Sequence, residues 1–442
     1  MDETYVQDII KKAGSQGCDA AEVFMKNASG ITVEVKNGEV DAFEVAKDFC
    51  IGVKIIKGKR MGFSFTTDKD QIDRIVDEAI EGARWTNDDE YLCISEGGKP
   101  QDVKVFDEVI NKIDEKDLIR DAILLEESAL KYDSRIKKVR KAEVSAGSGI
   151  TRIVNSNGLD VSYSSTYCSA SVSTLAEEDG GESQMGWEYA GSRRKKDIDL
   201  IVVGQGAAKR ALQLLGSRKI ETLKVPVILS PSVAIDFLEI LSASLSADAV
   251  QKGRSFLSGK LGKKIISSTI DIVDDGTRPW GAGTKPVDDE GTTTENKTLI
   301  ADGVLNSYLH NAYTAKKDGS LSTGNAVRAG AKSLTGVGIT NFYLRPAGNN
   351  PGSELIPTIS KGVLITSAMG VHTANPVSGD FSVGISGIWI ENGQLQYPVK
   401  EAIISGNILE LFNKVEGIGN DLTFYGSAGA PSLLIGDMDI SA

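Results

Sequence analysis

The sequence predicts an α+β protein made of two parts. The first is an N-terminal α/β region in which helices pack on an antiparallel meander, and the second is a C-terminal β-rich domain of barrel or sandwich character. With 442 residues, the chain is roughly three times the usual size of one domain. Hydrophobic residues make up 40% of it and charged residues 25%, which is typical of a folded protein with a sizeable core.

The first 86 residues are expected to form a helix, an antiparallel meander and a second helix. Apolar residues at helical spacing in residues 5–10 predict the first helix. Asn37-Gly38 predicts a two-residue hairpin turn, because both turn positions need a positive φ. Asp68 is the expected cap of a helix over residues 72–80. The strands are expected at residues 22–25, 31–35, 40–46, 50–56 and 61–65.

Residues 87–104 are polar and glycine-containing, so a linker or a long excursion is expected there. Beyond it we expect a helix over residues 116–131, three strands and a helix that ends at Gly216. The glycines at 204 and 206 mimic a dinucleotide-binding turn, but Lys209 stands in place of the third glycine, and a plain helix is expected. The three strands are expected at residues 136–145, 150–155 and 159–175. These elements give an N-terminal domain of residues 1–220, with subregions 1–86 and 105–220.

The C-terminal domain is expected to span residues 221–442. An apolar strand at residues 225–229 and a helix at 232–245 precede a long region rich in glycine, serine and threonine. Hairpin signals recur in that region, at Asp302-Gly303 and at Asn392-Gly393. Regularly spaced hairpins of this kind predict a barrel or a sandwich.

Charge and cysteine content exclude several classes of protein. Lysine and arginine number 49 against 61 aspartate and glutamate, and the net charge of −12 disfavours binding to nucleic acid or to anionic lipid. The four cysteines are widely spaced, as in a chain with free thiols in a reducing compartment. The N-terminus lacks a signal-peptide pattern, and prolines and acidic residues interrupt residues 225–245, so we expect a cytoplasmic protein without a membrane span.

Candidate catalytic residues are few, because the chain contains only two histidines, His310 and His372. His310 follows an alternating segment and is expected at a strand end on the surface. His372 lies in a loop shortly before Ser378 and Asp380, so these three residues are the candidates for nucleophilic hydrolysis. The sequence has neither a G-x-S-x-G nor an H-E-x-x-H motif.

The densest carboxylate cluster contains Asp288, Asp289 and Glu290. Oxygen ligands at this density could hold Mg²⁺ or Ca²⁺, although their spacing does not match a calcium loop. Aspartates beside glycine more often cap turns through their own side chains. A structural loop is therefore expected, and no metal.

Short segments in both halves of the chain form an ordered series. They are Asp19-Ala20-Ala21-Glu22-Val23-Phe24, Asn37-Gly38-Glu39-Val40-Asp41, Gly52-Val53-Lys54, Gly62-Phe63-Ser64, Val287-Asp288-Asp289-Glu290-Gly291, Leu299-Ile300-Ala301-Asp302-Gly303, Ser322-Thr323-Gly324-Asn325, Gly379-Asp380-Phe381-Ser382, Ile390-Glu391-Asn392-Gly393, Gly419-Asn420-Asp421 and Ala430-Pro431-Ser432. Over nearly its whole length the chain therefore resembles the TldD/PmbA family, whose members are described as modulators of DNA gyrase or as peptide-maturation proteases.

TldD-like members of this family carry H-E-x-x-x-H on the helix after the strand at 225–229, together with a distant cysteine, and hold zinc. With Glu239 in place of the motif glutamate, Leu238 and Ala243 stand where the two histidines would be. Neither side chain can bind zinc, and no cysteine follows Cys168. The resemblance therefore implies the PmbA (TldE) kind, which has no catalytic zinc ligands and no other cofactor.

The resemblance implies a heteromeric protease. A TldD-like H-E-x-x-x-H homologue would supply zinc, and this chain would supply an interface and part of a chamber for unstructured peptides, with Asp288, Asp289 and Glu290 as a candidate wall. A homodimer in the absence of that homologue is compatible with this hypothesis. Two other hypotheses stay open: an independent non-metal hydrolase that uses His372 with Ser378 and Asp380, and a topoisomerase-modulating binding protein.

Overall fold

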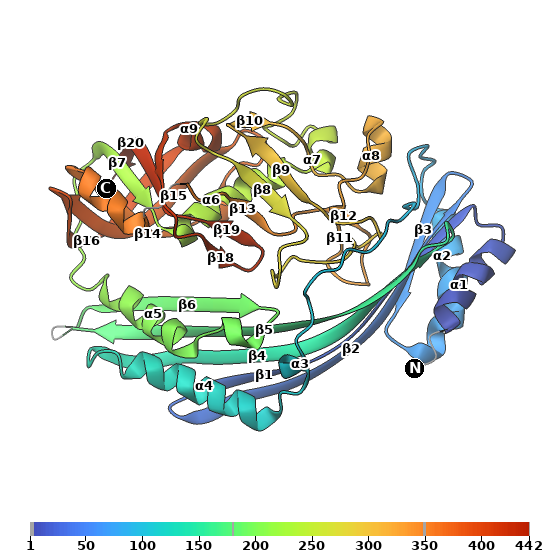
Figure 1. The fold of residues 1–442 in the computed structure, drawn as a ribbon, viewed down its shortest axis with the longest axis horizontal. Coiled ribbons are helices and arrows are strands. Elements are labelled where there is room, and N and C mark those ends of the chain that lie inside the picture. Colours follow the sequence, from blue (N-terminus) through green and yellow to red (C-terminus); the bar gives the residue numbers. More distant parts are fainter. Residues whose placement is uncertain (1–3, 179–180, 348–350, 442) are drawn as a thin grey trace.

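The computed structural model describes residues 4–178, 181–347 and 351–441, and its architecture is the α+β arrangement that the sequence predicts. A long, curved antiparallel sheet forms the N-terminal part. The β-rich C-terminal part lies over the concave face of this sheet (Figure 1).

The N-terminal sheet has six strands in the order β3-β2-β1-β4-β5-β6. Four of the short strands expected from alternation are halves of two long ones, because residues 26–30, between the first two expected strands, pair with residues 46–50. The hairpin between them turns at Asn37 and Gly38, with φ angles of 56° and 77°, which confirms the predicted turn. The strands are β1 (Ala20–Lys36), β2 (Glu39–Lys57), β3 (Arg60–Thr66), β4 (Ile136–Asn155), β5 (Asp160–Glu177) and β6 (Ser183–Ser192).

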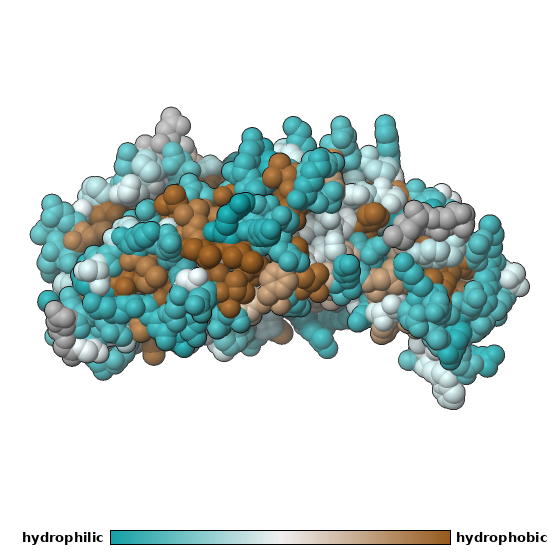
Figure 2. Space-filling model, turned by 90° about the horizontal axis from the view of Figure 1, so that it is seen from below, coloured by the Kyte–Doolittle hydropathy of each residue, from teal (hydrophilic) through white to brown (hydrophobic). Residues whose placement is uncertain are grey.

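Pairing of β1 with β4 joins the predicted subregions 1–86 and 105–220 into one sheet. Helices cover the convex face at both ends, where Val23 and Val53 pack against one pair and Val144 and Val172 against the other. These helices are α1 (Thr4–Ser15) and α2 (Ile72–Ala83) at one end and α4 (Glu115–Leu130) and α5 (Leu200–Leu212) at the other, with α3 (Glu108–Asn111) between them (Figure 1). Seen from below, hydrophobic side chains gather near the middle of this underside (Figure 2).

The concave face contacts the C-terminal part. Side chains alternate between the faces of a strand, so Phe24 and Ile153, which neighbour convex residues in sequence, point the other way. Both belong to a small buried cluster with Val287 and Ala331 of the C-terminal part. This contact holds the two parts of the molecule together.

The C-terminal part is built on a closed barrel. One sheet has the order β16-β15-β14-β7-β20-β17, and an additional pairing of β16 with β20 closes five of its strands into a ring. The predicted hairpin turn at Asn392-Gly393 connects two of these strands, β15 and β16. The strands are β7 (Leu223–Leu229), β14 (Lys361–Met369), β15 (Asp380–Glu391), β16 (Gln394–Asn407), β17 (Val415–Ile418) and β20 (Leu433–Ser441).

A second six-stranded sheet and helix α6 (Pro231–Ser244) complete this part. Phe237 of α6 is fully buried and packs against Phe381 of the barrel, with ring centroids 4.9 Å apart. The second sheet contains β8 (Ile272–Asp275), β9 (Asn296–Ala301), β10 (Val304–Leu305), β13 (Phe342–Leu344), β18 (Thr423–Tyr425) and β19 (Ala428–Ala430). Short elements are β11 (Ala326–Val327), β12 (Gly336–Val337), α7 (Ala247–Gln251), α8 (Ala312–Asp318) and α9 (Ile408–Asn413).

The polar segment at residues 87–104 is a structured excursion, one of the two forms expected for it. Its Asp89 accepts a hydrogen bond from Tyr313, and Gln101 donates its backbone N–H to Pro286. The segment therefore runs along the C-terminal part. Across the described residues, no helix combines the length and apolar character that a membrane crossing requires.

Candidate functional site

One side of helix α6 faces an open cavity of about 530 Å³. Asp236, Glu239, Ile240 and Ala243 line it together, because helical residues three or four apart share a face. The short turn η4 (Val371–Thr373) brings His372 to the same cavity. Residues from the predicted zinc-motif positions and the candidate catalytic histidine are thus neighbours in space, although they lie far apart in sequence.

The two carboxyl groups in this cavity are partly desolvated. Burial, with a smaller contribution from the like charge of Glu239, raises the pKa of Asp236 to about 6. Burial also raises the pKa of Glu239. Carboxyl groups tuned in this way can accept a proton near neutral pH or donate a hydrogen bond in mild acid.

The cavity does not fit a zinc site of the kind that the motif would build. Leu238 is fully buried in the core, whereas Ala243 lies on the exposed face, and five residues of helix separate their directions by about 140°. The open face offers two carboxylates, an isoleucine and an alanine, with one imidazole nearby. In the part of the chain that the structure describes, no three His, Cys, Asp or Glu side chains come together to hold a metal ion.

Ser378 lies in the turn that leads into β15, and Asp380 is the first residue of that strand. Asp380 accepts a hydrogen bond from Asn407 at 2.9 Å, and its backbone N–H donates to Ser378 Oγ at 3.3 Å. Hydrogen bonds that the carboxylate accepts from the side chains of Asn407 and Ser378 lower the pKa of Asp380. Among the described residues, neither Ser378 nor Asp380 makes a hydrogen bond or ion pair with His372. The three candidate residues therefore do not form a connected hydrolytic triad.

The carboxylates of residues 288–290 accept hydrogen bonds from, or form ion pairs with, three different sets of neighbours. Asp288 accepts backbone hydrogen bonds from Glu290 and Thr292 at 2.9 Å and from Ala326 at 3.0 Å. Its pKa is nevertheless raised, because burial and the neighbouring Glu290 outweigh those three donors. Asp289 accepts from Lys285 at 2.7 Å and from the backbone N–H of Arg328 at 2.8 Å.

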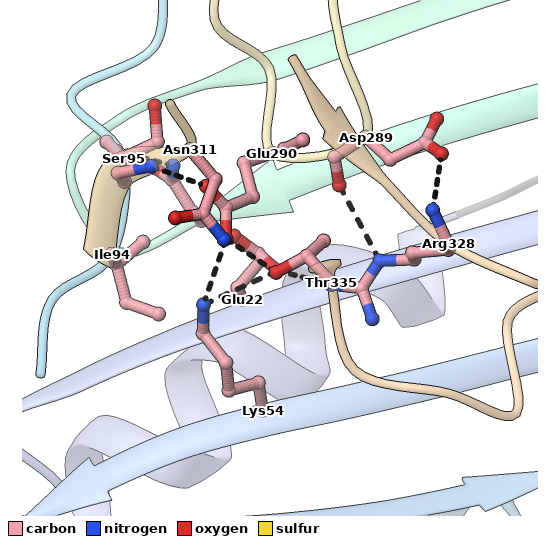
Figure 3. Close-up of polar contacts among 12 residues, drawn as sticks. Glu22, Lys54, Ile94, Ser95, Asp289, Glu290, Asn311, Arg328 and Thr335 are labelled. Atoms are coloured by element: carbon pink, nitrogen blue, oxygen red, sulfur yellow. Dashed lines mark hydrogen bonds and ion pairs between the residues drawn. The ribbon is translucent and has the colours of Figure 1, made fainter. Parts of the chain in front are cut away.

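A buried ionic cluster joins the sheet to the C-terminal part at this loop (Figure 3). The Lys54 ammonium lies 3.6 Å from Glu290 and 3.9 Å from Glu22, and Arg328 donates a hydrogen bond to Glu22. Burial lowers the pKa of Lys54, but Glu22 and Glu290 outweigh it, and the net pKa is raised. Glu290 also accepts from Thr335. Glu22 Oε2 is buried with no hydrogen-bond partner among the described residues.

The pairing of Glu22 with Lys54 and Arg328 was not among the features predicted from the sequence. One signal was available for the first two, since each interrupts an apolar strand segment with a charge. Arg328 carried no such signal, because its partner lies 306 positions away along the chain.

The position of His310 differs from the one that the sequence predicts. His310 is buried, with 7% of its surface exposed, and does not lie on the surface as predicted. Its ring Nδ1 has no hydrogen-bond partner among the described residues, and burial lowers its pKa. All four cysteines are free thiols.

Comparison with known proteins places the chain among the PmbA/TldA metallopeptidases. Models of this family match as domain 1 at residues 21–83, as the central domain at 108–215 and as the C-terminal domain at 222–442. Metalloprotease PmbA of Escherichia coli O157:H7 is 30% identical over 430 residues, which cover 96% of this chain and 92% of that protein. A metalloprotease TldD homologue of Buchnera aphidicola is 30% identical over 267 residues, or 57% of this chain and 54% of that protein.

Solved structures show the same fold. A proposed modulator of a DNA gyrase from Thermotoga maritima MSB8 matches with a TM-score of 0.92 and 28% identity over 100% of both chains. TldE from Thermococcus kodakarensis matches in fold with a TM-score of 0.89, at 21% identity over 99% of this chain and 100% of that one. Since the family models cover most of the chain, this protein belongs to the PmbA/TldD metallopeptidase family.

Proposed function

We propose that this chain is the PmbA/TldE-like, metal-free subunit of a cytoplasmic zinc metallopeptidase. A homologue with an H-E-x-x-x-H motif would supply the metal, and this chain would supply an interface and one wall of a chamber for unstructured peptides. The observation that carries the proposal is helix α6, where Leu238 and Ala243 stand at the two histidine positions of the zinc motif and neither side chain can bind zinc.

The concave face of the N-terminal sheet is the surface that we assign to the peptide. In the second half of β5, the alternate residues from 168 to 176 point to the convex face and are buried, while Ser169, Ser171 and Ser173 point the other way and are only partly covered. Small polar side chains leave room for an extended chain, whose backbone can form hydrogen bonds that do not depend on its sequence. That property suits broad specificity for unstructured peptides.

The free edge of β2 is the surface that we assign to the partner subunit. Strand β3 pairs with residues 51–57 only, so within the described chain residues 39–50 have no neighbour on their outer side. Val40, Phe43 and Val45 in this stretch are each more than two-fifths exposed. An unpaired edge with exposed apolar residues is a template for strand addition by another chain.

The test mixes this protein with its H-E-x-x-x-H homologue and follows both complex formation and cleavage of a casein-like peptide. We expect no stoichiometric zinc and no cleavage for this chain alone, and higher activity for the equimolar mixture than for the homologue. Equal activity of the homologue with and without this protein would reject the subunit role.

A pair of matched variants tests the interface. Phe43→Lys places a charge on the β2 edge, and Leu124→Lys places one on α4; both native side chains are 42% exposed. We expect Phe43→Lys to weaken the complex on gel filtration at least tenfold, while Leu124→Lys leaves it intact. Equal effects would show that the complex forms elsewhere, without deciding whether it is active.

A further inference from the structure

A second cavity, of about 220 Å³, lies on the concave face where β1, β4 and β5 meet the C-terminal part. Of the described residues, four cationic side chains line it, but only one carboxylate does, Asp289. The cations are Lys26, Arg193, Lys285 and Arg328. This excess of positive charge stands out in a chain whose net charge is −12.

The charges of this cavity are not neutralised by its own carboxylate. Both oxygens of Asp289 are already used, by Lys285 and by the backbone N–H of Arg328. Arg328 has a counter-ion outside the cavity, Glu22. Counting both carboxylates against the four cations still leaves two positive charges in excess.

Arg193 is the clearest of the uncompensated cations. Its guanidinium donates to the backbone carbonyls of Gly281 at 3.0 Å, Ala282 at 2.7 Å and Thr166 at 3.2 Å. Among the described residues, no carboxylate lies within ion-pair distance of it. Those three bonds hold the group in place and leave two of its five N–H donors for a ligand. Burial lowers its pKa, as expected for a cation that has lost water without gaining an anion.

The size and walls of the cavity narrow the ligand further. At about 220 Å³ the cavity is smaller than the ~300–1,000 Å³ of typical small-molecule pockets, which suits one end of an extended peptide. Phe24, Tyr163 and Tyr167 give it aromatic walls, and Arg328 already lies over the Phe24 ring at 5.0 Å. Such walls suit a side chain, while a planar guanidinium suits a carboxylate.

We infer that this cavity binds the C-terminal carboxylate of an extended peptide, with Arg193 and Lys26 as the main ligands. The inference rests on the proposed function only in taking a peptide as the occupant. It adds an anchor that fixes which end of the peptide enters the junction between the two parts of the molecule.

The test measures binding to this chain alone, by fluorescence anisotropy, so it is independent of the partner and of cleavage. The probes are an N-terminally labelled octapeptide of glycine, serine and alanine with a free C-terminal carboxylate, the same peptide as its C-terminal amide, and the amide with glutamate as its last residue. We expect the free acid to bind on the order of tenfold more tightly than the plain amide, because a charge-assisted hydrogen bond is lost on amidation. Added salt should reduce that ratio.

Two variants and a control locate the effect. Lys26→Met removes a cation that has no hydrogen bond or ion pair of its own in the described chain, so this variant should fold like the wild type. Arg193→Met removes the buried guanidinium. We expect both to abolish the preference for the acid, and Arg345→Met, an exposed arginine paired with Asp271, to retain it. Equal binding of acid and plain amide, an unchanged ratio in Lys26→Met, or equal binding of the glutamate amide and the free acid would overturn the assignment. Loss of partner-dependent cleavage with this preference intact would instead contradict only the proposed function.

Discussion

At the scale of single residues, the partly buried carboxyl group of Asp236 makes the stability of the protein depend on pH. It lies on the open face of α6, where burial and Glu239 raise its pKa from 3.8 to about 6. The folded state therefore holds this proton more tightly than the unfolded state. The resulting stabilisation is fully present below about pH 4 and is lost as the pH rises through about 6. We predict that Asp236→Asn is more stable than the wild type at pH 8, by about 1–2 kcal/mol, with little difference at pH 4.

Urea unfolding at the two pH values checks this prediction, with Asp380→Asn as the control. The pKa of Asp380 is lowered because its carboxylate accepts hydrogen bonds from Asn407 and Ser378, so the sign of the pH effect reverses. Its stabilising contribution is present above the unfolded pKa and is lost as the pH falls through the folded value. The control variant should therefore be less stable than the wild type at pH 8. A pH-independent difference for Asp236→Asn would contradict the argument.

At the scale of elements, helices α4 and α5 are held together by a close approach at Gly204. A Cβ atom placed there would lie 1.9 Å from Ser128 Oγ and 2.8 Å from the backbone oxygen of Leu125. The glycine that mimics a nucleotide-binding turn in the sequence is thus a packing residue between two helices on the convex face. We predict that Gly204→Ala lowers the free energy of unfolding by about 1–3 kcal/mol, because a backbone atom must move.

Gly82 in α2 provides a matched control for this helix contact. It is also helical, but its Cβ would meet no atom closer than 4.0 Å. Gly82→Ala should be neutral or stabilising by about 0.5–1 kcal/mol, since alanine restricts the unfolded chain and fits the helix. Thermal unfolding of both variants is the measurement, and similar changes in Tm would show that the spacing of α4 and α5 does not depend on Gly204.

At the scale of the whole molecule, the buried ionic cluster couples the sheet to the C-terminal part. Arg328 is the cation that faces Glu22, and both side chains are almost completely buried. Arg328→Met would leave Glu22 buried with the more distant Lys54, at 3.9 Å, as its remaining cation. We predict a loss of about 3–5 kcal/mol in the stability of the assembled molecule, the usual cost of breaking a buried pair from one side.

Calorimetry and limited proteolysis of residues 87–104 measure this coupling. The variant should unfold at a lower temperature and be cut faster in that segment, which runs along the C-terminal part. Arg345→Met breaks an exposed pair and should cost less than about 1 kcal/mol. A variant of Arg328 as stable as that control would mean that apolar contacts alone, such as Phe24 with Val287, join the two parts.

Much of the fold followed from local patterns, and the candidate site did so only in part. Asn37-Gly38 predicted its hairpin because the turn chemistry is contained in two residues. The strand breaks predicted at residues 26–30 and 47–49 were wrong, because these residues continue β1 and β2 and pair across the two strands. Leu238 and Ala243 were compared as equivalent zinc-ligand positions, but the helix directs one into the core and leaves the other on the exposed face.

The sequence by itself determined the elements, the family resemblance, and the lack of the motif histidines and of any cysteine in the C-terminal half, since these depend on residue type and short spacing. Only the tertiary structure decided which charges meet. Glu22 and Arg328 meet because the C-terminal part packs on the N-terminal sheet. Lys26 and Arg193 line one cavity because β1 and the segment after β6 converge there. The physical reason is that alternation and turn chemistry act over a few residues, whereas the partner of a buried charge is chosen by the packing of segments that are distant along the chain.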